Sequence, residues 1–137
     1  MVTIITEYNE GDTQLFEHYW CPLLYKYKDQ KVEFIFVDST SNLNKIAPKL
    51  PNVKIKTISK ENFISAAFKV SSKAKYDTIV FTKIDLVPTY AAMVAFKQAK
   101  KSIINILEGG KIISHPSESP KLIMFDNNIT MYSVENE

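Results

Sequence analysis

The chain is 137 residues long, with 45% apolar and 23% charged residues, a composition typical of one globular domain that buries a hydrophobic core. Its net charge is only +2 and every basic residue is a lysine, which argues against a nucleic-acid partner because arginine is the usual bidentate reader of phosphate and guanine. No apolar run reaches the roughly 20 residues of a membrane span, and the first residues are typical of a strand and not of a signal peptide.

Short β-branched and apolar runs predict strands in the first part of the chain. They lie at residues 2–6, 32–37, 53–58 and 78–82. Apolar residues at helical spacing follow the turn at residues 11–13, and Pro22 should kink or split this first helix. A second helix, which Ser59 could cap, is predicted from the apolar stripe Phe63, Ala66, Ala67, Val70 and Ala74.

Thr89 could cap a third, long helix whose inward residues include Ile103 and Ile106, and which the glycines at 109–110 would stop. After it the pattern changes to strands without helices. Residues 111–114 and 121–125 are predicted strands, and a tight turn at 126–128 leads into a strand at 129–132, which gives a terminal hairpin. We therefore predict one α/β domain over residues 1–137, a Rossmann-related sandwich with a mostly parallel sheet and a C-terminal antiparallel hairpin.

Polar residues follow the predicted strands where three of them end. These residues are Glu7-Tyr8-Asn9, Asp38-Ser39 and Lys83-Ile84-Asp85. Ligands of parallel α/β sheets bind beyond the carboxyl ends of the strands, so this rim is the predicted binding site.

Four motifs in this order resemble the GT-A glycosyltransferases, especially their family-2-like group: VTIITEYNE, VEFIFVDSTS, ENFISAAF and DTIVFTKIDLVP. The resemblance covers the chain from about Val2 to Phe96. It implies a GT-A-like fold and sugar transfer from a nucleotide-sugar donor, with Asp38 holding the nucleotide. It also implies Mn²⁺ or Mg²⁺ between the carboxylates of an Asp-x-Asp motif and the donor diphosphate, whose charge must be neutralised as the sugar bond breaks.

The chain departs from that motif, because Lys83 stands where the first aspartate is expected and only Asp85 remains. A lysine repels a cation, but it could contact a diphosphate directly as a point charge. Donor binding would then be independent of metal, with Glu7, Tyr8, Asn62 and Lys83 as further nucleotide contacts. Asp85 is either a remaining metal ligand or a loop carboxylate paired with Lys83.

Other departures favour a degenerate member of the family. Phe63 and Ile64 replace a glycine of the third motif and would narrow a donor pocket. The sequence identifies no catalytic residue, and Glu118 and Asp126 are the only late acidic candidates for an acceptor base. His115 could be a late metal ligand, although a lone loop histidine is usually not one.

Each candidate also has a structural interpretation. Asp38 suits turn chemistry, Tyr8 could be a rim contact, and Asn62 could simply cap its helix. The alternative function is therefore a pseudoenzyme, a non-catalytic structural or protein-interaction module on the same fold. The aromatic group Phe16, Tyr19, Trp20, Tyr25 and Tyr27 is predicted to be mostly core, with an exposed remainder that would mark a protein partner or a second copy.

The single cysteine, Cys21, excludes an internal disulfide and a multi-cysteine metal site. We therefore expect an intracellular setting, in the cytoplasm or within a viral assembly. Abundant lysine, isoleucine and asparagine without arginine favour an A/T-rich genome, of a virus or of a low-G/C bacterium.

Overall fold

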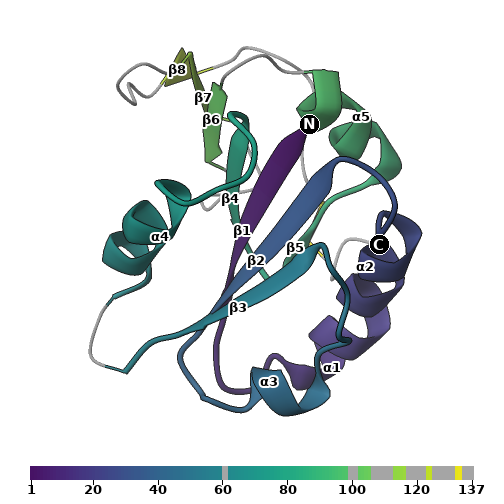
Figure 1. The fold of residues 1–137 in the computed structure, drawn as a ribbon, viewed down its shortest axis with the longest axis vertical. Coiled ribbons are helices and arrows are strands. Elements are labelled where there is room, and N and C mark those ends of the chain that lie inside the picture. The colour runs from purple at the N-terminus through teal and green to yellow at the C-terminus, as the bar shows by residue number, and fades with distance from the viewer. Residues whose placement is uncertain (60–61, 99–101, 106–112, 117–122, 125–131, 134–137) are drawn as a thin grey trace.

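The computed structural model describes residues 1–59, 62–98, 102–105, 113–116, 123–124 and 132–133 (Figure 1). At its centre lie four parallel strands in the spatial order β3-β2-β1-β4. They are β1 (Val2–Tyr8), β2 (Val32–Asp38), β3 (Val53–Thr57) and β4 (Ile79–Lys83). The predicted strands and the parallel α/β architecture are confirmed, and the strand order is Rossmann-like.

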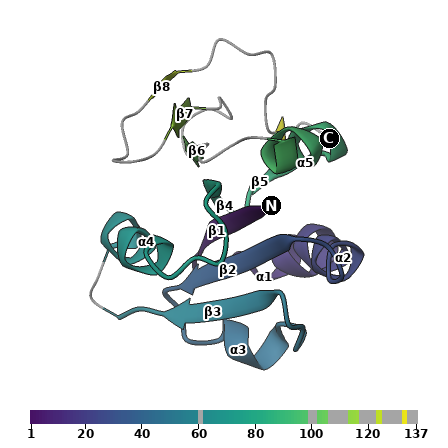
Figure 2. The same cartoon turned by 45° about the horizontal axis from the view of Figure 1, so that its top comes forward.

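The apolar runs of β1 and β2 form strands because helices cover both faces of the sheet. Alternate side chains enter two hydrophobic clusters, one on each face. The larger cluster packs under α1 (Thr13–Leu15), a π-helical turn (Phe16–Trp20), α2 (Cys21–Lys26) and α5 (Tyr90–Gln98). The smaller cluster packs under α4 (Phe63–Ser71), which lies on the opposite side of the sheet (Figure 2).

Pro22 divides the first helix, as predicted. It lies in the first turn of α2, directly after a π-helical turn, and has no N–H to donate to the carbonyls of that turn. The turn before it, from Phe16 to Trp20, is π-helical, so the backbone is wider there. This geometry buries both Phe16 and Trp20, while Tyr19 and Tyr25 remain exposed. The aromatic group is thus mostly core with an exposed remainder, as the sequence predicts.

The helices α4 and α5 are each capped by a side chain next to the helix start in the sequence. Asn62, not Ser59, caps α4, because its Oδ1 accepts a hydrogen bond from the Ser65 N–H at 2.8 Å. Thr89 caps α5 as predicted, since its Oγ1 accepts the Ala92 N–H at 3.1 Å. A short helix that the sequence did not predict, α3 (Leu43–Ile46), follows β2.

The prediction that the third helix continues through Ile103 is wrong. α5 spans Tyr90–Gln98, and Ser102–Asn105 forms strand β6, parallel to β4. β7 (Ile113–Pro116) pairs antiparallel with β6, and β8 (Ile123–Met124) pairs antiparallel with β7. Pairing with a distant strand therefore overrides the helical spacing of the isoleucines.

The terminal hairpin is not confirmed. β9 (Tyr132–Ser133) pairs with β5 (Leu86–Val87), whereas β8 pairs with β7, so these described segments do not pair with each other. The predicted turn at 126–128, the glycines at 109–110, Ile106, Glu118 and Asp126 lie outside the described residues. His115 is in β7, in register with Ile103 of β6.

No helix among the described residues is long and apolar enough to cross a membrane, which agrees with the sequence prediction.

Candidate functional site

The strand order places a topological switch point between β1 and β4. The chain moves from β1 outward to β2 and β3, and then returns to the other side of β1 to form β4. The strand order reverses there, and ligands of doubly wound sheets bind beyond the carboxyl ends of the strands at such a position. Glu7 of β1 and Lys83 of β4 are register partners across this point.

Because register partners in a parallel ladder point to the same face, the carboxylate of Glu7 and the ammonium of Lys83 leave the sheet on the same side. Both side chains are half-buried. The Nδ2 of Asn9 donates a hydrogen bond to the Glu7 Oε2 at 2.6 Å, which fixes the carboxylate at the rim. A carboxylate held by Asn9 and an ammonium on the same face therefore flank the switch point.

The Lys83-Ile84-Asp85 turn is anchored at its centre. The indole Nε1 of Trp20 donates a buried hydrogen bond of 2.8 Å to the Ile84 carbonyl oxygen, and the Ile84 N–H donates to the Glu7 carbonyl at 3.3 Å. Ile84 itself is buried in the larger cluster, while Lys83 and Asp85 on either side are half-buried. The fold thus holds the backbone of the turn and leaves the two charged side chains at the surface.

Lys83 and Asp85 do not form an ion pair with each other or with another residue in the described part of the chain. The interpretation of Asp85 as the salt-bridge partner of Lys83 therefore finds no support.

Asp12, in the turn that precedes the first helix, joins this rim. Its Oδ2 accepts the Asn9 N–H at 2.7 Å, and it makes no side-chain cap bond to α1. Burial raises the pKa of Asp12, and the negative charges of Asp85 and Glu7 raise it further, against the opposing effects of the Asn9 N–H and Lys83. Asp12 therefore lies close enough to Glu7, Lys83 and Asp85 to feel their charges, which sequence spacing does not reveal.

Asp38 is fully buried at the end of β2, and its carboxylate bonds to its own loop. The Oδ1 accepts the Thr40 N–H at 2.7 Å and the Thr40 hydroxyl at 2.6 Å, and the Oδ2 accepts the Leu43 N–H at 2.9 Å. These bonds turn the chain into α3. They are the turn chemistry that the sequence offered as the alternative to a nucleotide contact.

Tyr8 and Asn62 also make structural contacts. The Tyr8 ring is 2% exposed and packs edge-on against Phe16, with its hydroxyl 2.9 Å from the Thr13 Oγ1. Asn62 is exposed at the start of α4 and uses its side-chain oxygen for the cap. Of the five predicted nucleotide contacts, Glu7 and Lys83 are the two that meet at the switch point.

The rim does not fit a divalent cation. The described residues include no group of three histidine, cysteine, aspartate or glutamate side chains placed to hold a metal ion. Lys83 lies beside Glu7 in the register and contributes a positive charge where a second carboxylate would be needed.

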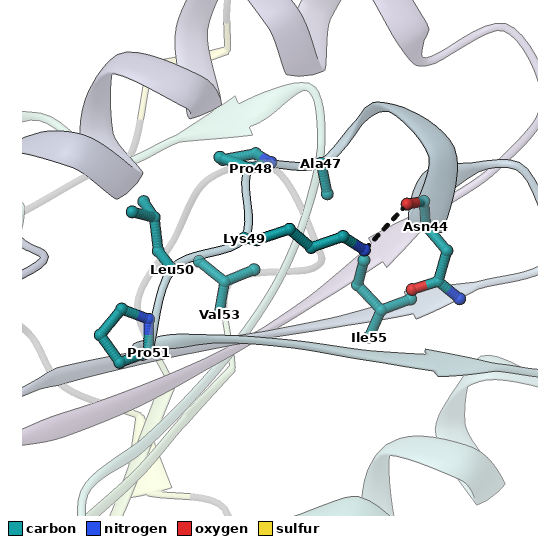
Figure 3. Close-up of a pocket in the computed structure, with 8 residues that line it drawn as sticks. All are labelled: Asn44, Ala47, Pro48, Lys49, Leu50, Pro51, Val53 and Ile55. Atoms are coloured by element: carbon teal, nitrogen blue, oxygen red, sulfur yellow. Dashed lines mark hydrogen bonds between the residues drawn. The ribbon is translucent and has the colours of Figure 1, made fainter.

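Two hollows are formed by described residues away from this rim. One, of about 370 Å³, lies between α3, the segment that follows it and the face of β3 (Figure 3). The other, of about 170 Å³, lies near the amino ends of β2 and β3 and contains the buried carboxylate of Glu33, which Lys54, the Lys75 N–H and the Thr3 hydroxyl satisfy. Sequence reasoning identified neither hollow, because each depends on how the connections fold back over the sheet.

Neither a protein-family model nor a curated protein matches this chain. A proposal for the function of this chain therefore rests on the arrangement of its residues.

Proposed function

We propose that this chain is a degenerate nucleotide-binding domain of the glycosyltransferase type, in which Lys83 meets the diphosphate of a nucleotide-sugar without a divalent cation. The observation that carries the proposal is the pairing of Glu7 and Lys83 across the β1–β4 switch point, next to a turn that Trp20 anchors. The ammonium of Lys83 supplies a phosphate contact, and the carboxylate of Glu7 is an acceptor for ribose hydroxyl or base N–H groups.

The neighbouring charges limit the affinity of this site. Asp12 and Asp85 interact electrostatically near Lys83 and would repel a diphosphate. The interaction between Lys83 and phosphate is also partly exposed, so salt should screen it over about 8–10 Å at ordinary ionic strength. We therefore expect weak, salt-sensitive nucleotide binding, and any sugar transfer to be slow.

A second candidate function is a non-catalytic interaction module on the same fold. It is favoured by the use of Asp38 and Tyr8, two of the expected nucleotide contacts, in the loop and the core of the domain itself. In this case the rim charges are solvated and bind no nucleotide.

Isothermal calorimetry with uridine and guanosine diphosphates, with and without Mn²⁺, separates the two functions. The proposal expects binding that does not require Mn²⁺, that weakens with salt and that Lys83→Ala reduces. Lys69→Ala, which removes an exposed lysine of α4, is the matched control and should leave binding unchanged. Binding that requires Mn²⁺ in the unaltered protein contradicts the proposal, and no binding of either nucleotide supports the interaction module.

Lys83→Asp provides a second test, because it restores an Asp-x-Asp sequence with Asp85. If the rim retains the glycosyltransferase arrangement, this variant should bind the diphosphate only with Mn²⁺. A variant that binds neither Mn²⁺ nor nucleotide would show that the rim no longer has that arrangement.

A further inference from the structure

No described strand pairs with the outer edge of β3. β3 is the last strand on its side of the sheet. Towards β2, the Asn52 carbonyl accepts the Phe34 N–H at 2.8 Å and the Ile58 N–H donates to the Asp38 carbonyl at 2.9 Å. Because successive residues of a parallel strand alternate between its two neighbours, the backbone groups of Val53, Ile55 and Thr57 point outward.

Only one of these outward groups has a partner within the described part of the chain. The Val53 N–H donates to the Leu50 carbonyl at 3.1 Å, which closes the turn before the strand. The backbone N–H and C=O of Ile55 and the N–H of Thr57 point away from β2 and have no hydrogen-bond partner in the described part of the chain. A segment of a few extended residues could therefore add to this edge.

A hollow of about 370 Å³, lined mostly by aliphatic residues, lies beside the same strand. Val53 and Ile55 form its floor, and Ala47, Pro48, Leu50 and Pro51 form much of its wall (Figure 3). The side chain of Lys49 extends across the hollow, and its Nζ donates a hydrogen bond of 3.1 Å to the Asn44 carbonyl. A side chain that entered from an added strand would meet aliphatic groups on this face.

The edge is basic. Every charged residue between Ser39 and Lys60 is a lysine. On the face of β3 away from the hollow, Lys54 is neutralised by the buried carboxylate of Glu33, whereas the exposed Lys56 has no ion pair within the described residues. Charge complementarity therefore favours an acidic partner at Lys56.

We propose that the outer edge of β3 binds an extended acidic segment of a partner protein, which adds as a strand and alternates apolar and acidic residues. Its apolar side chains occupy the hollow beside Val53 and Ile55, and its carboxylates lie on the opposite face, near Lys56. The alternation follows from the period of a β-strand, whose successive side chains point to opposite faces. This edge is separate from the rim at the ends of β1 and β4, so the proposal does not depend on nucleotide binding.

A second copy of the chain fits this edge poorly. An antiparallel pair of β3 strands centred on Ile55 would place Lys54 of each copy opposite Lys56 of the other, and like charges opposite each other destabilise a pair. Lysines on an edge strand commonly prevent such self-association. Nucleic acid would match the charge, but it would use neither the outward backbone groups nor the apolar hollow.

The probe is the capped heptapeptide SEVEVES, titrated into the ¹⁵N-labelled full chain and followed by two-dimensional NMR. The comparison peptides are SKVKVKS, which reverses the charge, and SEEEVVS, which keeps the composition but loses the alternation. We expect SEVEVES to shift the amide signals of the non-proline residues from 47 to 57 and to bind at least several-fold more tightly than either comparison peptide.

Two pairs of variants test the residues of the edge. Thr57→Pro removes an outward N–H without touching the ladder to β2, while Thr57→Ala keeps it; only the proline variant should weaken binding, by about twofold to tenfold for one hydrogen bond. Lys56→Glu should weaken binding by about threefold to tenfold, whereas Lys73→Glu, an equal charge change beyond the end of α4, should not.

The proposal is overturned if SEVEVES shifts none of these signals at millimolar concentration, or if SEEEVVS binds equally well, since charge alone would then explain the interaction. It is also overturned if an oligothymidylate shifts the same signals more strongly, which would indicate nucleic acid. Shifts of the same signals with protein concentration alone would indicate a second copy and would equally refute it.

Discussion

Replacing Trp20 with phenylalanine should weaken both the core and the turn that carries Lys83. Trp20 is fully buried and packs edge-on against Phe34 and Phe36, with ring centroids 6.4 and 5.8 Å away. Its Nε1 is the donor to the buried Ile84 carbonyl oxygen. Phenylalanine keeps one aromatic ring in the cluster but has no donor, so Trp20→Phe removes the hydrogen bond and leaves a small cavity.

The two losses have comparable magnitudes. A buried carbonyl left without its partner costs about 1–3 kcal/mol. The missing part of the indole costs about 1–2 kcal/mol, a fraction of the roughly 3–5 kcal/mol for complete truncation of a buried aromatic residue. We therefore expect the free energy of unfolding to fall by about 2–5 kcal/mol, out of a total of about 5–15 kcal/mol for a domain of ordinary stability.

Urea unfolding measures the loss of stability, and hydrogen exchange measures the effect on the turn. The Ile84 amide, bonded to the Glu7 carbonyl at 3.3 Å, should exchange faster in Trp20→Phe. Phe34→Leu is the control, because it shrinks the same cluster but leaves the Trp20–Ile84 hydrogen bond in place. If Trp20→Phe loses no more stability than Phe34→Leu, and the Ile84 amide exchanges no faster, then Trp20 does not anchor the turn.

Three further predictions concern buried or capping polar groups. Asp38→Ala should lower the free energy of unfolding by about 2–4 kcal/mol, because it leaves the Thr40 and Leu43 N–H groups without their acceptor; a loss below about 1 kcal/mol in urea unfolding would contradict this. Burial alone would raise the pKa of Glu33, but hydrogen bonds from Lys54, the Lys75 N–H and Thr3 outweigh it and lower the pKa. Glu33 therefore stabilises the fold at neutral pH, and this stability is lost as the pH falls below the ordinary glutamate pKa of about 4.5. Glu33→Gln should make the melting temperature depend less on pH in this range. A melting temperature with the same pH dependence as that of the unaltered protein would count against the lowered pKa. Asn62→Ala should cost about 1 kcal/mol through the lost cap of α4, while Asn62→Ser should recover most of it in thermal melts, and equal melting of the two variants would exclude the cap.

The amino-acid sequence by itself determined the elements whose cause is local. The runs at the start of the chain and before Asp38 are apolar at nearly every position, which predicts buried strands of a covered sheet. Pro22 had to interrupt its helix because it lacks an N–H, and Thr89 had the hydroxyl that a helix start requires. The gathering of Glu7 and Lys83 at one rim followed from parallel strands, whose carboxyl ends share an edge.

Only the tertiary structure decided features that depend on distant partners. The segment at Ile103 has helical spacing, but it pairs with β4 and becomes a strand, because ladder bonds to a central strand outweigh local propensity. Asp38 could have faced a ligand or its own loop, and the choice lay with the Thr40 and Leu43 N–H groups, which α3 brings within reach. The bond from Trp20 to Ile84 spans 64 positions in the chain, so no local pattern could reveal the anchor of the candidate site.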